Sequence, residues 1–139
     1  MVLARMSAAL LATAVCASVS FSTTARAEDP PADPGAAQFM KSCGVCHTVD
    51  PKAELRQGPN LATVVGRTAG TLAEYPTYSK AMKEAGAGGL VWNPETIDKW
   101  ISGPADMIPN TNMFYQQPDP DKRKIIIDYL TRVSKSGGK

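Results

Sequence analysis

Two cysteines and a histidine stand together in the run Cys43-Gly44-Val45-Cys46-His47, a C-x-x-C-H pattern that contains the one histidine of the sequence. Cysteines at this spacing can project from the same side of a helical turn, so both thiols can bond to the vinyl groups of one haem. The next residue then offers its imidazole to the iron. The pattern therefore predicts c-type haem attachment through Cys43 and Cys46, with His47 as an iron ligand.

The C-x-x-C pair has two competing interpretations. Thioredoxin-like redox pairs use the same spacing, and so does half of a zinc site. A zinc site needs further thiolate or imidazole ligands, and no cysteine or histidine follows His47 in the chain. The motif and its surroundings therefore favour haem.

Residues 1–27 have the pattern of a secretory signal peptide. Arg5 gives a basic start, residues 8–15 are apolar, and Ala25-Arg26-Ala27 fits an A-x-A cleavage site. The apolar run is shorter than the roughly 18 residues of a membrane-spanning helix, which favours a cleaved signal over a retained anchor. A lipid anchor on Cys16 is a further alternative, disfavoured because a bulky valine precedes that cysteine. Export predicts a periplasmic protein.

The mature chain is expected to form one domain. Residues 28–34 are rich in proline and acidic residues and predict a flexible lead-in, and residues 35–139 form the folded domain. Loss of the two arginines of the signal leaves 13 basic residues against 13 acidic ones, so the mature chain is neutral. This balance argues against nucleic acid or an anionic membrane surface as a partner.

Hydrophobic periodicity and capping signals predict an all-α domain with four or five short helices, long loops and no strands. The best start signal is Asn93-Pro94-Glu95, which combines a capping side chain, a proline at the first helical position and an acid in the first turn. Helices are expected at residues 35–47, 77–85, 93–103 and 119–134, and residues 104–118 are expected to form a long loop. Such a loop in a small domain is usually functional.

A haem iron that transfers electrons usually has a second strong axial ligand, and methionine sulfur is the common one. Met40 lies one turn before the first cysteine and cannot reach around the ring. Met82 falls in a predicted helix, where filling the core is the simpler role. Met107 and Met113 both lie in the long loop. The residues favour Met113, which has a proline and a threonine nearby to fix the approach of the chain, and leave Met107 open.

Further residues follow the C-x-x-C-H motif in a recognisable order. Gly35 and Phe39 precede the motif. The residues that follow it are Gly58-Pro59-Asn60-Leu61, Gly66-Arg67, Trp92, Pro109 to Met113 and Tyr129-Leu130. In this order the chain resembles class I cytochrome c, in the subgroup of short soluble bacterial carriers related to mitochondrial cytochrome c. The resemblance extends from Gly35 through the last helix.

The resemblance implies a small class I cytochrome c fold wrapped around one covalently attached haem c. It assigns Met113 as the second iron ligand and Pro59 as the residue whose carbonyl accepts the other ring N–H of His47, a bond that orients the imidazole. It makes Gly35 and Phe39 the contact at which the first and last helices cross. It also assigns four residues as donors to the haem propionates: Arg67, Tyr78, Trp92 and Thr111.

The implied function is a monomeric one-electron carrier that is not an enzyme. Its redox partners would be a quinol-cytochrome c reductase, a terminal oxidase, a photosynthetic centre or a periplasmic dehydrogenase. Two alternatives remain: a haem subunit of a larger dehydrogenase or oxidase, and an open-site haem protein of the peroxidase-like or gas-binding kind. The expected partner surface comprises Met40 to Ser42, Ala105, Met107, Asn112 and Phe114.

The chain also departs from its relatives. Where they often carry lysines around the exposed haem edge, it has Ser42, Ala105, Asp106 and Asn112, so a strong cationic docking ring is not expected. Trp100 stands where a tyrosine near the methionine ligand is common, which changes the expected hydrogen bonding there.

Overall fold

The computed structural model describes residues 33–137, and within this range the chain forms five helices. They are α1 (Pro34–Ser42), α2 (Lys80–Ala87), α3 (Pro94–Ser102), α4 (Pro104–Met107) and α5 (Pro120–Lys135). Within the described range, Thr68 and Val91 form one isolated antiparallel β-bridge, which is not part of a longer strand. The all-α prediction is confirmed. The predicted signal peptide and most of the lead-in lie outside the described residues.

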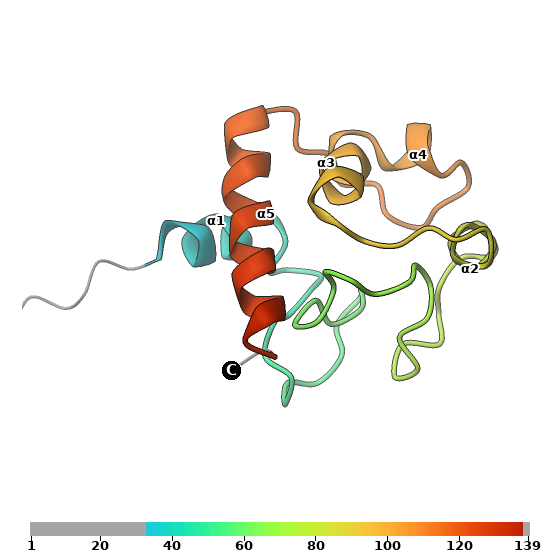
Figure 1. The fold of residues 1–139 in the computed structure, drawn as a ribbon, viewed down its shortest axis with the longest axis horizontal. Helices are drawn as coiled ribbons and strands as arrows, with labels where there is room; N and C mark the ends of the chain where they lie inside the picture. The colour runs from blue at the N-terminus through green and yellow to red at the C-terminus, as the bar shows by residue number, and fades with distance from the viewer. Residues whose placement is uncertain (1–32, 138–139) are drawn as a thin grey trace, which may run out of the picture.

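Figure 1 shows α1 and α5 crossing, with α3, α4 and α2 spread along the other side of the domain. The crossing depends on Gly35, because a Cβ there would lie 2.7 Å from the Cβ of Tyr129. Phe39 is 1% exposed and its ring lies 5.6 Å from that of Tyr129. Arg132 of α5 donates to both carboxylate oxygens of Asp33. The predicted contact between the first and last helices is therefore present.

Helix α1 begins and ends earlier than predicted. The carboxylate of Asp33, placed in the lead-in by the sequence, caps the helix by accepting from the Gly35 N–H at 2.8 Å. The helix was expected to continue through the haem motif, but it ends at Ser42. The N–H groups of Cys43 and Gly44 both donate to the Phe39 carbonyl, at 2.7 and 3.0 Å, so the i to i−4 series stops and the motif continues as turns.

The other helices match the expectations in part. Helix α2 begins later than predicted, because the Ser79 hydroxyl caps it by accepting from the Met82 N–H at 3.1 Å. Helix α3 begins as predicted, with a reciprocal capping box between Asn93 and Thr96. Helix α4 lies inside the segment predicted as loop. A four-residue helix is too short to show a hydrophobic period in the sequence.

Helix α5 begins after Asp119, as predicted, and packs Ile126 and Leu130 into the core, where they are 1% and 3% exposed. Trp92 and Trp100 pack against each other in the same core with ring centroids 5.6 Å apart. No helix among residues 33–137 has the length and apolar character needed to cross a membrane.

Candidate haem site

The described residues enclose a cavity of about 570 Å³, lined from α1, α2, α3, α5 and the long loops. This volume is typical of pockets that hold large organic ligands. All the residues that the sequence analysis assigned to the site line it: Cys43, Cys46, His47, Pro59, Arg67, Tyr78, Trp92, Thr111 and Met113. The fold thus brings together segments that are far apart in the sequence.

The His47 imidazole is oriented by a backbone carbonyl. Its Nδ1 lies 2.8 Å from the oxygen of Pro59, and because a carbonyl can only accept, Nδ1 carries the proton and donates it. The lone pair is then on Nε2. Burial lowers the pKa of His47, and the positive charge of Arg67 lowers it further against the opposing effect of the Pro59 bond. The neutral imidazole that a metal needs is therefore the favoured form.

Gly58 packs directly against the imidazole. A Cβ at this position would overlap the ring, lying 2.6 Å from Nδ1 of His47 and closer still to its Cε1 atom. The Gly58 N–H also donates to the Cys46 carbonyl at 2.8 Å, which closes the loop after the motif. Gly58 belongs to a run that matches class I cytochrome c, but its close approach to the imidazole was not predicted from the sequence. Its one visible signal was the glycine directly before Pro59.

Both cysteines line the cavity, and the surroundings of Cys43 disfavour its thiolate. Burial, with a smaller contribution from Cys46, raises the pKa of the Cys43 thiol to about 11. A thioredoxin-like pair needs a lowered thiol pKa, so this environment argues against the redox alternative. Among residues 33–137, no three histidine, cysteine or acidic side chains gather into a metal-binding group.

The side chain of Arg67 lines the cavity with a hydrogen-bond donor that lacks an acceptor among the described residues. Its Nη2 donates to the Asn60 carbonyl at 3.1 Å, but within the described part of the chain its buried Nη1 has no hydrogen-bond partner. An unpaired buried donor is costly, and a haem propionate is the kind of acceptor that would satisfy it. The arginine and the C-x-x-C-H donor set therefore fit the group that the sequence implies.

Two tyrosines lie beside Arg67 in the cavity wall. Burial raises the pKa of Tyr78, and its ring meets that of Tyr75 edge to face at 4.8 Å. The Tyr75 hydroxyl donates to the Gln57 carbonyl at 2.5 Å and ties this wall to the loop after the haem motif. Tyr75 was missed in the sequence. Its spacing of three residues from Tyr78 was the available signal.

The structure separates the two loop methionines. Met113 is partly buried and lines the cavity, whereas Met107 ends α4 and packs against the hydrophobic core away from the cavity lining. Met40 is 58% exposed. Met82 also lines the cavity, from within α2, where it is a member of the core cluster as its helical position suggested.

Comparison with known proteins agrees with this geometry. The family model for cytochrome c matches residues 32–134. A cytochrome c2 of Rhodopila globiformis is 43% identical, with 73% of this chain and 93% of that protein covered. A cytochrome c of Ginkgo biloba is 36% identical, with 77% and 94% covered. The structure of cytochrome c2 from Rhodospirillum centenum superimposes with a TM-score of 0.67 at 33% identity, covering 72% of this chain and 95% of that one.

The helical fold and the cavity lined by a C-x-x-C-H motif define a c-type cytochrome domain. The chain belongs to the cytochrome c family, in class I. Its cofactor is haem c, attached covalently, and it is an electron-transport protein.

Proposed function

We propose that this chain is a periplasmic one-electron carrier in which Cys43 and Cys46 would anchor one haem and His47 and Met113 would bind its iron. The observation that carries the proposal is the composition of the cavity wall. It combines an imidazole with its Nε2 lone pair free and a methionine sulfur from a separate loop.

When bound, the haem supplies the one-electron ferric and ferrous couple. The Pro59 bond and the Gly58 backbone keep the His47 ring in one orientation. A thioether ligand from Met113 favours the ferrous state and raises the reduction potential. If both His47 and Met113 bound the iron, the protein would leave no iron position open to a substrate. This is the argument for a carrier and against the open-site alternative.

Apolar side chains near the mouth of the cavity form the proposed contact surface for redox partners. Val45 and Phe114 both line the cavity and are 82% and 88% exposed. Met40 does not line it but precedes the cavity-lining Lys41 in α1 and is 58% exposed. Large apolar side chains left in water mark interaction sites when they gather in one area. Because the mature chain is neutral, docking would depend on this apolar contact more than on charge.

The ligand assignment is tested by comparing Met113→Ala with Met107→Ala in the haem-loaded protein. We expect Met113→Ala to lower the reduction potential by a substantial part of the roughly 0.8 V range that axial ligation spans, and to admit carbon monoxide or imidazole at the iron. Met107→Ala should change neither. An unchanged potential in Met113→Ala, with a changed one in Met107→Ala, would show that the other sulfur is the ligand.

The choice between a free carrier and a bound subunit is tested by purifying the mature protein from periplasm. A monomer that carries haem and exchanges electrons with added redox proteins supports the free carrier. A stable complex with a dehydrogenase or oxidase would instead assign the chain as a subunit.

A further inference from the structure

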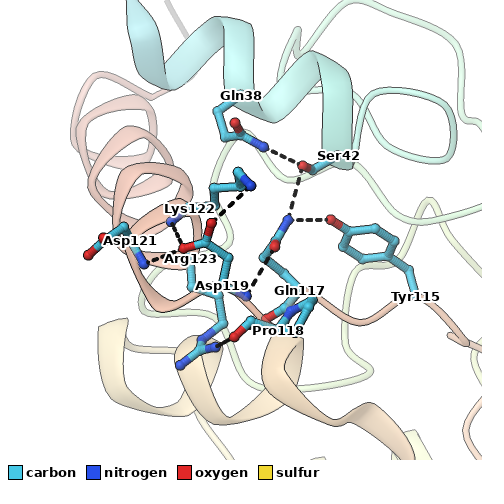
Figure 2. A network of polar contacts seen from close by, with 9 residues as sticks. All are labelled: Gln38, Ser42, Tyr115, Gln117, Pro118, Asp119, Asp121, Lys122 and Arg123. Atoms are coloured by element: carbon cyan, nitrogen blue, oxygen red, sulfur yellow. Dashed lines mark hydrogen bonds and ion pairs between the residues drawn. The ribbon is translucent and has the colours of Figure 1, made fainter.

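The segment that carries Met113 ends at a buried glutamine. Gln117 is 7% exposed, although glutamine is a mostly exposed residue type. Its side chain lies between the end of α1 and the start of α5, where Figure 2 shows its amide reaching Ser42 and Tyr115. Its Nε2 donates to the Tyr115 hydroxyl at 2.8 Å, and the longer contact with the Ser42 hydroxyl measures 3.5 Å.

The orientation of this amide is fixed by its other end. The Asp119 N–H lies 3.3 Å from Oε1 of Gln117, and because a backbone N–H can only donate, the amide oxygen must face it. The amide nitrogen is therefore turned toward Tyr115 and Ser42. The Ser42 hydroxyl also accepts from the Gln38 amide at 2.6 Å, which extends the network along α1 (Figure 2).

The backbone of Gln117 is held as firmly as its side chain. Its N–H donates to the Ile101 carbonyl in α3 at 2.8 Å. Nη1 of Arg123 donates to the Gln117 carbonyl at 3.1 Å and to the Pro118 carbonyl at 3.0 Å. Arg123 is in turn paired with Asp98 of α3 at 2.7 Å. Gln117 is thus fixed to α3 and α5 by its main chain and to α1 by its side chain.

The residues between the methionine and this glutamine have few such bonds. Among residues 112–116, all within the described range, the hydrogen bonds are the one from the Met113 N–H to the Thr111 hydroxyl, at 3.4 Å, and the one between Tyr115 and Gln117. Tyr115 itself lines the cavity with Met113. On its C-terminal side, the position of Met113 therefore depends on where Gln117 is held.

We propose that Gln117 is a positioning residue for Met113. Gln117 ties the loop that carries Met113 to Ser42, the residue directly before the haem-attaching Cys43. This proposal rests on the function proposed above, because it takes Met113 as the iron ligand. Without the side-chain hydrogen bonds of Gln117 the loop would be held by its backbone contacts alone. The Met113 sulfur would then leave the iron more easily, and an external ligand could compete for the vacated position.

The test measures imidazole binding to the ferric, haem-loaded protein, followed through the near-infrared sulfur-to-iron absorption band. Gln117→Ala should bind imidazole about tenfold more tightly than the native protein, a ratio that corresponds to roughly 1.4 kcal/mol, the scale of one or two hydrogen bonds. Gln116→Ala is the matched control, because Gln116 is the adjacent glutamine, is exposed and does not line the cavity. It should bind imidazole as the native protein does.

A second variant guards against misfolding of the first. Tyr115→Phe keeps the ring and removes only the hydroxyl that Gln117 contacts, and it should bind imidazole about threefold more tightly. Helical circular dichroism in denaturant is recorded for each variant to confirm that binding is measured on folded protein. Unchanged imidazole binding in both Gln117→Ala and Tyr115→Phe would overturn the proposal, even if unfolding shifts, because the network would then be merely structural.

A parallel measurement on Met113→Ala separates the two proposals. If Met113→Ala binds imidazole tightly while Gln117→Ala and Tyr115→Phe match Gln116→Ala, the ligand assignment stands and the positioning role fails. If Met113→Ala leaves both the band and imidazole binding unchanged, the ligand assignment fails and the positioning role falls with it.

Discussion

The two segments that face the cavity with the proposed iron ligands are built in opposite ways. The N–H groups of Cys46 and His47 both donate to the Cys43 carbonyl, and the His47 ring donates to the Pro59 carbonyl and packs against Gly58. All of these partners lie within 17 residues of chain. Met113 has one weak local hydrogen bond, at 3.4 Å, in a segment without regular structure. Its place depends on Gln117, four residues later, which is held by residues far away in the sequence: Ser42 through its side chain and Ile101 through its backbone N–H.

This difference predicts different sensitivities. Where a ligand is held by close packing of neighbouring residues, one added side-chain atom displaces it, because the packing leaves no space for that atom. A site held at its ends tolerates changes within the loop and responds to changes at the anchors. The histidine side should therefore be rigid, and the methionine side should be the one that opens.

The largest expected effect comes from Gly58→Ala. The added methyl group would overlap the His47 ring, so we expect displaced imidazole ligation and an altered visible spectrum of the haem-loaded protein. Gly88→Ala is the matched control, since a Cβ there meets only carbonyl oxygens at 3.4 Å. Phe114→Ala, in the methionine loop and 88% exposed, should keep the native spectrum. A native spectrum in Gly58→Ala would break the comparison.

Gly35→Ala tests whether the stability of the α1 and α5 crossing is independent of the iron ligands. Its Cβ would lie 2.7 Å from that of Tyr129, so we expect overpacking to lower the free energy of unfolding by about 1–3 kcal/mol. The reduction potential should stay unchanged, because the α1 and α5 crossing contains neither ligand. Denaturant unfolding and potentiometry on the same sample check both parts, again with Gly88→Ala as the control. A shifted potential would show that the crossing and the ligands are coupled.

Arg67→Met tests the polar wall that both ligand segments share. Removing a buried positive charge beside the cavity should favour the ferric state and lower the reduction potential by tens of millivolts, where 59 mV corresponds to a tenfold change for one electron. Arg67→Lys retains the charge and should lie between Arg67→Met and the native protein. Potentiometric titration measures the order, and a rise in potential in Arg67→Met would contradict the assignment of Arg67 to a propionate.

The smallest expected effect is that of salt on electron exchange with a partner. Raising ionic strength from about 0.1 M to about 1 M shortens the Debye length from about 10 to about 3 Å. We expect the second-order rate constant to change less than about threefold. Without the predicted signal peptide the chain has 13 basic and 13 acidic residues, and the exposed Val45 and Phe114 at the cavity are apolar. Stopped-flow reduction measures it. A fall of ten- to a thousandfold, as strong electrostatic steering gives, would contradict apolar docking.

The same contrast explains what the sequence could predict. The histidine side is encoded locally, so C-x-x-C-H alone indicated Cys43, Cys46 and His47 and their chemistry. The choice between Met107 and Met113 stayed open on residues alone, because α4 is too short to show a period and it is α4 that takes Met107 out of the loop. The residues alone favoured Met113 without excluding Met107, and the resemblance to class I cytochrome c made that assignment firmer.

Other features needed the structure for a similar reason. The end of α1 at Ser42 depends on two N–H groups sharing one carbonyl, which no periodicity reveals. The role of Gln117 depends on partners from three helices and on a residue type that sequence reasoning assigns to the surface. The N-cap at Asn93 was predictable because its signal, Asn93-Pro94-Glu95, lies in three consecutive residues, whereas the reciprocal bond with Thr96 came from the structure.

The most direct test of the account is an absorption spectrum of the purified mature protein in both redox states. Covalent haem with imidazole and thioether ligation predicts the sharp visible bands of a reduced low-spin c-type haem and, in the oxidised protein, a near-infrared sulfur-to-iron band. A colourless folded protein, or a haem protein whose resting iron is high-spin with an open sixth position, would contradict it.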